Sequence, residues 1–161
     1  MKKYKLGKCE GNELCRVIAL RDFADVKKGD IGGRIQSKEN LSHEGDAWVS
    51  GNARVSGNAR VYGNARVYGN AQVSGDARVS GDARVSGDVR VSGNARVTKF
   101  LVNVIMKPFP ITITDNHVQI GCELLRKDHL AQDGLTAAKK YNLDKKTVAK
   151  YRAIVKVLMM T

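Results

Sequence analysis

Aromatic residues are scarce in this chain. Phe, Trp and Tyr make up 6% of its 161 residues, and Trp occurs once. Only two prolines are present, and the apolar tail at residues 154–160 is far too short to span a bilayer. The composition therefore predicts no membrane-spanning helix, and it favours a core built from small aliphatic side chains.

Cysteine is equally sparse, with three residues at positions 9, 15 and 122 and no closely spaced pair of the zinc-binding type. Cys122 with His117 and His129 lacks a fourth metal ligand. We therefore expect no metal and no cofactor, and buried reduced thiols instead. No signal peptide is recognisable, so we expect a reducing, cytoplasmic environment.

Acidic residues are outnumbered by basic ones. The chain has 28 Lys and Arg but 16 Asp and Glu, which gives a net charge of +12. The excess lies toward the ends: +4 in residues 1–42, +2 in residues 43–98 and +6 in residues 99–161. A strongly basic chain favours acidic partners such as nucleic acid or an acidic protein surface, with simple solubility as the alternative.

What the chain has in abundance is one six-residue repeat. From residue 49 to residue 98 it reads Val-Ser/Tyr-Gly-Asn/Asp-Ala-Arg, with little variation. Alternate residues of a strand point to opposite sides, so Ala and Val face one way while Arg and Ser or Tyr face the other. Gly and Asn suit corners because they tolerate a positive φ. We therefore predict a four-residue strand and a two-residue corner in every repeat, and hence a solenoid.

Aliphatic and small residues four positions apart, such as Val49 and Ala53, resemble the hexapeptide repeat of left-handed β-helices. In that family three hexads form one triangular coil of about eighteen residues with a narrow interior. The resemblance implies left-handed winding and about three coils, counted from His43 to Arg96. Hexapeptide β-helices are often acyltransferases, but no loop carrying a catalytic His interrupts these repeats.

The fold class that we predict is mainly β. The expected parts are an N-terminal β cap at residues 1–42, a short three-coil β-solenoid at residues 43–98, an exit strand and β-hairpin at residues 99–122, and a helical segment at residues 123–161. The hairpin is expected to turn at Asp115-Asn116. The cap is expected because a solenoid exposes unpaired strands at its ends.

Three sequence segments outside the regular repeats resemble a more specific group of proteins. ALRDFADVKKGDIGGRI and NLSHEGDAWVSGNARV before the repeats, with ITITDNHVQIGC after them, resemble a group of small phage and prophage proteins. That resemblance covers roughly residues 4–122. It implies a β-solenoid fold and a phage or prophage origin, hence the cytoplasm of an infected or lysogenic bacterial host, and it implies no particular reaction.

Stacking at an interval of eighteen residues predicts which outward side chains lie over one another. Arg60, Arg78 and Arg96 form one column, with Tyr62 beside it. Trp48, Arg66 and Arg84 form another, with Tyr68 beside it, and Trp48 is expected to make a cation–π contact with Arg66. These eight residues are the predicted partner-binding positions, because Arg can follow phosphates and Tyr can stack on bases. The alternative is that outward positions simply need polar residues.

The C-terminal segment carries the second candidate site. Residues 135–142 are predicted to form a short helix that ends at Asn142, and Asp144 is predicted to cap a helix over residues 145–157. The pattern resembles a helix-turn-helix, in which the basic residues would face nucleic acid. The alternative is a helical cap or a dimer contact. The candidate residues are Lys139, Lys140, Lys145, Lys146, Thr147, Lys150 and Arg152.

The sequence contains no complete catalytic constellation, and we expect a protein that is not an enzyme. The leading hypothesis is a phage-type binding protein that inhibits a host defence complex or nuclease, as anti-CRISPR proteins do, through a host protein, a ribonucleoprotein or a nucleic-acid-binding site. The alternatives are a DNA- or RNA-binding protein that uses the C-terminal helices, and an acyltransferase. A homo-oligomer formed through the C-terminal helices is also considered, and no membrane partner is expected.

Overall fold

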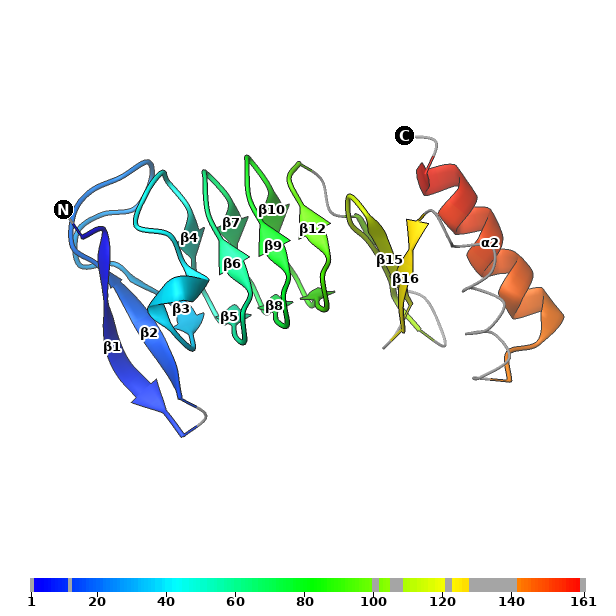
Figure 1. Cartoon of the computed structure of the whole chain (residues 1–161), viewed down its shortest axis with the longest axis horizontal. Coiled ribbons are helices and arrows are strands. Elements are labelled where there is room, and N and C mark those ends of the chain that lie inside the picture. The colour runs from blue at the N-terminus through cyan, green and yellow to red at the C-terminus, as the bar shows by residue number, and fades with distance from the viewer. Residues whose placement is uncertain are drawn as a thin grey trace. The chain divides into compact units, whose positions relative to one another are not determined.

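A computed structural model describes residues 2–11, 13–99, 102–104, 109–120, 123–127 and 142–159. The chain divides into two compact units, residues 1–101 (unit 1) and residues 102–161 (unit 2), and each is described by itself. Unit 1 contains a β-solenoid, whose strands stack in rows, together with the hairpin of β1 (Tyr4–Glu10) and β2 (Leu14–Ala19) (Figure 1). The predicted mainly-β solenoid fold is confirmed.

Each repeat contributes one short strand to unit 1. The strands are β4 (Trp48–Val49), β5 (Arg54–Val55), β6 (Arg60–Val61), β7 (Arg66–Val67), β8 (Gln72–Val73), β9 (Arg78–Val79), β10 (Arg84–Val85), β11 (Arg90–Val91) and β12 (Arg96–Val97). They are two residues long rather than the predicted four, because the corner takes the rest of the hexad. Across one corner the N–H of Ala53 donates to the carbonyl of Ser50 at 3.2 Å.

The strands form three parallel faces. One is β4-β7-β10, and another is β6-β9-β12. The third contains β3 (Ile31–Ile35) and has the order β3-β5-β8-β11, with β3 next to the hairpin β1–β2. Partners in the repeats are eighteen residues apart, as in Val61 opposite Val79 and Val79 opposite Val97. The predicted stacking interval is therefore confirmed.

Valine and alanine fill the interior, as predicted. Val67 and Ala65 are 0% exposed, while the outward residues are largely exposed. The corner glycines have positive φ, and Gly63 (φ 68°) shows why no larger residue fits well: an added Cβ would lie 3.0 Å from the backbone nitrogen of Gly81 in the next turn. Backbone conformation and close stacking therefore both select glycine there.

The solenoid has about four turns, one more than the three predicted. The first turn comprises β3, Leu41 and β4, of which only β4 lies within the predicted solenoid. Ile35 pairs with Val55 and Leu41 bridges to Val61, which are intervals of twenty residues instead of eighteen. The two extra residues lie between Leu41 and β4. Because they interrupt the six-residue period, the period alone does not reveal that the residues before them also belong to the solenoid. The predicted cap at residues 1–42 thus contributes strands to the solenoid itself.

The hairpin β1 (Tyr4–Glu10) and β2 (Leu14–Ala19) extends the sheet that contains β3, and it projects beyond the corners of the solenoid (Figure 1). Cys9 and Cys15 are direct partners across this hairpin and form a disulfide. The expectation of buried reduced thiols is wrong for this pair, because antiparallel pairing places two strand residues opposite each other and leaves Cys9 exposed. Cys122 lies outside the described residues.

The described residues of unit 2 form a four-stranded antiparallel sheet with a helix packed on it. The strands are β13 (Val102–Val104), β14 (Ile111–Ile113), β15 (His117–Ile120) and β16 (Glu123–Arg126), and the helix is α2 (Lys145–Met159). The hairpin β14–β15 turns at Asp115-Asn116, as predicted. The start of the predicted helical segment instead forms β16, because residues 123–126 find a partner in β15.

The core of unit 2 lies between the sheet and α2. Tyr151 and Val155 of α2 pack with Ile111, Ile113 and Val118 of the sheet. The Tyr151 hydroxyl also donates to the carbonyl of Phe109 at 2.6 Å and accepts from its N–H at 2.8 Å. The apolar side of α2 is therefore occupied within unit 2.

Candidate functional site

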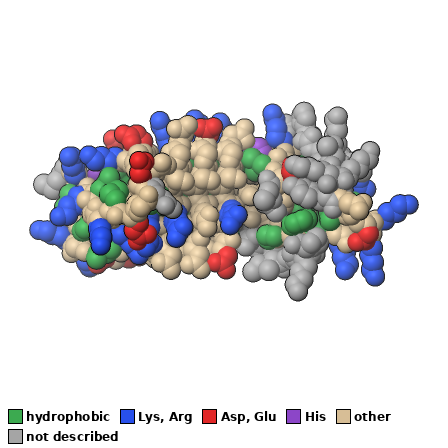
Figure 2. All heavy atoms as spheres, turned by 90° about the horizontal axis from the view of Figure 1, so that it is seen from below, with side chains coloured by type: hydrophobic (Ala, Val, Ile, Leu, Met, Phe, Trp, Pro, Cys, Tyr) green, Lys and Arg blue, Asp and Glu red, His purple; other side chains and the backbone are tan. Residues whose placement is uncertain are grey.

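The predicted arginine column lies on the face β6-β9-β12. Arg60 is opposite Arg78, and Arg78 is opposite Arg96. All three residues are exposed, and Tyr62 beside the column is 41% exposed. The backbone thus holds three guanidinium groups in register across successive turns. Lys and Arg side chains are spread over the end of unit 1 that carries β1–β3, with a few acidic side chains between them (Figure 2).

The other predicted column is only partly available. Arg84 is exposed, and so is Tyr68 at 41%, but Trp48 is 4% exposed. Trp48 packs edge-on against Phe23 from the loop between β2 and β3. The prediction that Trp48 is a surface residue is therefore wrong, because that loop covers the first turn on this face.

Arg66 is held by the same loop. Its guanidinium forms an ion pair with Asp25. Among the described residues, the cation–π contacts are those of Lys3 and Arg21 with Phe23, and the contact predicted between Arg66 and Trp48 is not among them. Asp25 is itself well exposed, and such a surface pair contributes little to stability. Of the predicted face residues, Arg60, Tyr62, Arg78 and Arg96 are exposed on one face, whereas Trp48 is buried.

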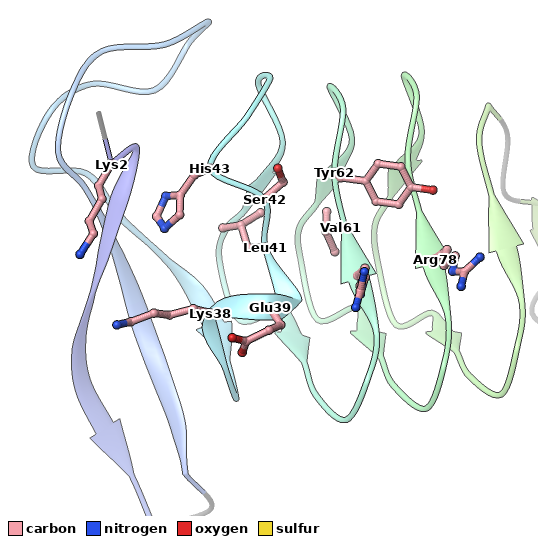
Figure 3. Close-up of a pocket in the computed structure, with 10 residues that line it drawn as sticks. Lys2, Lys38, Glu39, Leu41, Ser42, His43, Val61, Tyr62 and Arg78 are labelled. Carbon is pink, nitrogen blue, oxygen red and sulfur yellow. The ribbon is translucent and has the colours of Figure 1, made fainter.

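A groove opens where that surface meets the first turn. Its volume is about 720 Å³. The two additional residues of the first turn are His43 and Glu44, since the N–H of Ser42 donates to Val61 as that of Tyr62 does to Val79, and Gly45 again lies over Gly63. The insertion thus lies at this groove. The lining residues are Lys2, Lys38, Glu39, Leu41, Ser42, His43, Arg60, Val61, Tyr62 and Arg78 (Figure 3).

The groove is strongly cationic. Lys2, Lys38, Arg60 and Arg78 contribute four positive charges, and Glu39 contributes the single carboxylate among the lining residues. Hydrogen bonds from its own backbone N–H and from the Ser37 hydroxyl, together with the charges of Lys38 and Arg60, lower the pKa of Glu39, so it is ionised at neutral pH. The lining therefore attracts anions while keeping one acceptor.

His43 is held in one orientation. Its Nδ1 accepts the backbone N–H of Lys3 at 3.2 Å, and its ring stacks on Tyr4 with 4.2 Å between centroids. Burial and the nearby charges of Lys3, Lys2 and Lys38 lower the pKa of His43. The imidazole is therefore neutral at pH 7, with its proton on Nε2, where it acts as a donor.

Lys3 supports the groove from inside. It is 0% exposed, and its Nζ donates to the carbonyls of Glu44, Gly45 and Ala47 at 3.5, 3.2 and 2.8 Å. These bonds fix the corner that contains the insertion. Burial lowers the pKa of Lys3 to about 8, and the charges of Arg21 and Arg66 act in the same direction.

The groove residues Lys2, Lys38, Glu39, Ser42 and His43 were not among the predicted site residues. The sequence did contain a signal for them, because the segment between Leu41 and Trp48 is two residues longer than the six-residue spacing requires. Where a solenoid repeat is interrupted, the chain leaves the flat face, and side chains from two turns can then surround a hollow.

The C-terminal candidates lie in unit 2. Lys145, Lys146, Lys150 and Arg152 are exposed on α2, and the sequence of this helix contains no acidic residue. Asn142 has φ 48° and Asp144 caps α2, both as predicted. Thr147 donates its N–H and its hydroxyl to Asp144 at 2.8 and 2.7 Å, so it serves the cap. Lys139, Lys140 and the predicted helix at residues 135–142 lie outside the described residues, apart from Asn142.

Within the described parts of the chain, no three His, Cys, Asp or Glu side chains gather in a way that would hold a metal ion. None of the helices described there is long and apolar enough to cross a membrane.

Comparison with known proteins points to the same architecture. The YdcK beta-solenoid repeat matches residues 47–61, 59–75, 71–87 and 77–93. No curated protein matches the chain. The repeat match and the three stacked faces together define a β-solenoid repeat protein. The repeat to which it is similar is that of YdcK.

Proposed function

We propose that this chain is a non-enzymatic binding protein that holds an acidic macromolecule against the Arg60–Arg78–Arg96 column. The observation that carries the proposal is the register of these three exposed arginines on one face. Because the solenoid backbone spaces them, no loop has to be ordered on binding, and the entropy cost is limited to the side chains that contact the partner. The net charge of +12 accelerates the encounter with an acidic partner.

The specific form of the proposal is a phage-type inhibitor of a host defence complex or nuclease. Its support is the resemblance of the phrases before and after the repeats to phage and prophage proteins, combined with a small, rigid, basic surface. Such a surface binds an acidic protein patch, or competes for the site that a nuclease uses for its own substrate, without any chemical step.

The geometry of His43 favours binding over acyl transfer. A general base needs an unprotonated nitrogen aimed at the substrate, but Nδ1 of His43 already accepts the Lys3 N–H and Nε2 therefore carries the proton. The chain's acidic group in the groove, Glu39, is ionised and so cannot act as an acid at neutral pH. We therefore place acyltransferase chemistry behind binding.

The test is capture of partners from host lysate, before and after nuclease treatment, followed by mass spectrometry. The wild-type chain is compared with Arg78→Glu/Arg96→Glu, and the control is Arg54→Glu/Arg90→Glu, which makes the same charge change on another face. We expect a protein that survives nuclease treatment and is lost only with the first variant. If both variants lose the partner equally, binding depends on net charge alone, and the assignment of the partner to this face is contradicted.

A second candidate function is nucleic-acid binding by α2. It is favoured by four exposed basic side chains on a helix without acidic residues. Each phosphate contact adds to the salt dependence of binding. Lys146→Glu/Lys150→Glu should therefore weaken duplex binding and flatten its dependence on salt, whereas Lys5→Glu/Lys8→Glu in β1, with the same net charge, should not. Unchanged binding by the α2 variant would remove this candidate.

A further inference from the structure

The groove at the first turn has a composition that differs from the flat face next to it. Four cations from separate segments line it: Lys2 before β1, Lys38 in a short 3-10 helix (Lys38–Asn40), and Arg60 and Arg78 on two successive turns. Lys2 and Lys38 lie toward one end of the groove and Arg78 toward the other (Figure 3). Like charges that share one hollow repel each other, and an anion bound between them relieves that repulsion. A ligand with phosphate groups supplies several negative charges in a small volume.

Neutral donors lie beside these cations. His43 is fixed by Lys3 and Tyr4 with its proton on Nε2, and the Ser42 hydroxyl, which accepts the N–H of Glu44 at 3.0 Å, keeps its own hydrogen for donation. Charged and neutral donors in one hollow suit phosphate oxygens, which accept several hydrogen bonds each. The arrangement therefore favours phosphate over a single carboxylate.

The groove also contains a feature that phosphate does not need. Tyr62 replaces the serine found at most equivalent positions of the repeat, and its ring is 41% exposed. It projects from the turn next to Ser42 and His43 (Figure 3). An exposed aromatic face stacks on a planar base, and this contact does not depend on the identity of the base.

Glu39 is the second such feature. Its carboxylate is ionised and lies among cations, where it would oppose a ligand made only of phosphate. In dinucleotide-binding folds, an acidic residue near the phosphate site accepts a hydrogen bond from a ribose hydroxyl, which shows that the two features can serve one ligand. A ligand that combines phosphate, hydroxyl groups and an aromatic base accounts for all of these side chains.

We infer that this groove is a binding site for a free nucleotide. The phosphates lie among Lys2, Lys38 and Arg60, the base stacks on Tyr62, and Glu39 accepts from the ribose. The volume of about 720 Å³ is within the usual range for small-molecule sites. This inference rests on the proposed function, since it assigns a ligand class to a hollow beside the same arginine face.

The experiment is titration calorimetry of the full chain with ATP, with inorganic pyrophosphate and with a short single-stranded oligonucleotide, in magnesium-free buffer. We expect one ATP per chain and weaker binding of pyrophosphate. Tyr62→Ser should weaken ATP binding roughly tenfold, because a base–aromatic stack is lost. The control is Tyr68→Ser, which removes an equally exposed Tyr from the same repeat position on another face and should leave binding unchanged.

A charge variant completes the test. Lys38→Glu should abolish ATP binding, since it places a second carboxylate beside Glu39. The inference is overturned if the wild-type chain binds no ATP, if pyrophosphate binds as tightly as ATP and Tyr62→Ser has no effect, or if the two Tyr variants behave alike. Binding of the oligonucleotide without ATP also overturns it and assigns nucleic acid to the open face.

The failure of this inference is distinguishable from failure of the proposed function. If ATP does not bind but a host partner is still lost specifically with Arg78→Glu/Arg96→Glu, the groove assignment alone is wrong. If the chain captures no partner yet binds ATP with the expected variant pattern, the macromolecular proposal alone is wrong.

Discussion

Asn58 donates a side-chain hydrogen bond to Asp76, eighteen residues later, with 3.0 Å between Nδ2 and Oδ1. The two residues occupy the same corner of successive turns. Asn64 and Asp82, at 3.0 Å, and Asn70 and Asp88, at 2.8 Å, repeat the arrangement. An amide lies beneath each of these carboxylates, because Asn occupies the corners at 58, 64 and 70 and Asp occupies the corners one turn later at 76, 82 and 88. This order prevents these carboxylates from stacking on each other.

This relationship predicts that Asn64→Asp destabilises the solenoid by about 1 kcal/mol, because it replaces a donor by a second carboxylate facing Asp82. Urea denaturation at pH 7 measures the change. The matched control is Asn52→Asp, which faces the neutral Asn70 instead and should cost less. We call these Asn–Asp hydrogen bonds between successive turns the corner ladder. If the two variants lose equal stability, or if the loss persists after both carboxylates are protonated at low pH, repulsion between stacked carboxylates is not the cause.

Val67→Asp should abolish the folded solenoid. Val67 is 0% exposed, and an unpaired charge in an apolar interior costs several kcal/mol or forces the carboxyl to remain protonated. Loss of the β-sheet signal in circular dichroism is the expected result. Arg78→Glu, at an exposed position, should change the free energy of unfolding by no more than about 0.5 kcal/mol. A Val67→Asp variant with a native melting curve would show that the assignment of inside and outside is wrong.

Asn40 closes the first turn with its side chain. It is 0% exposed, its Nδ2 donates to Gly57 at 2.9 Å and Ala59 at 2.8 Å, and its Oδ1 accepts from Gln36 at 3.1 Å and Ser37 at 2.8 Å. Asn40→Ala leaves these backbone groups without partners and should cost about 3 kcal/mol.

Thermal or urea unfolding measures that cost. The control is Asn58→Ala, which removes one exposed ladder bond and should cost less than about 1 kcal/mol. A similar effect of both substitutions would mean that water replaces the bonds of Asn40 and that the first turn is open to solvent.

Lys3 makes stability depend on alkaline pH. Its pKa is about 8 when folded and 10.5 ordinarily. Between these values the unfolded chain binds more protons than the folded chain, so the free energy of unfolding rises with pH. From pH 7.5 to 9.5 this rise should be about 1–2 kcal/mol. Burial raises the pKa of Tyr4 from 10.0 to about 12, so stability falls again from pH 10 to 12.

Lys3→Met should remove the rise between pH 7.5 and 9.5, and Lys5→Met, at an exposed position of β1, should keep it. Urea unfolding across this interval measures both. A wild-type stability that stays flat or declines over the interval would show that Lys3 keeps its proton in the folded chain.

Much of the solenoid follows directly from the repeat. Ala and Val recur on the side of the strand opposite to Arg, so hydrophobic burial alone places Ala65 and Val67 inside and Arg66 outside. The short period also determines the stacking interval, and hence the column of Arg60, Arg78 and Arg96, since every repeat has the same length. The cap at Asp144 and the left-handed residue Asn142 are predictable too, because they depend on neighbours within a few residues.

Other features depend on chain segments that meet only after folding. Trp48 occupies an outward position of the repeat, and its burial depends on Phe23 from a loop about 25 residues earlier in the sequence. The pairing of Cys9 with Cys15 depends on the register of β1 and β2. Spacing within the sequence carries too little information about such contacts, because it does not specify which loop covers which face.

The first turn and its groove show most clearly which features are predictable from the sequence and which depend on the tertiary structure. The sequence by itself determined a solenoid of Val and Ala with an exposed arginine column, because these features repeat and depend on local alternation. Only the tertiary structure decided that β3 and Leu41 add a turn, and that Lys2, Lys38, His43 and Tyr62 surround one hollow. The physical reason is the two-residue insertion at His43 and Glu44, which shifts the register of pairing and is resolved only when the backbone hydrogen bonds between turns are formed.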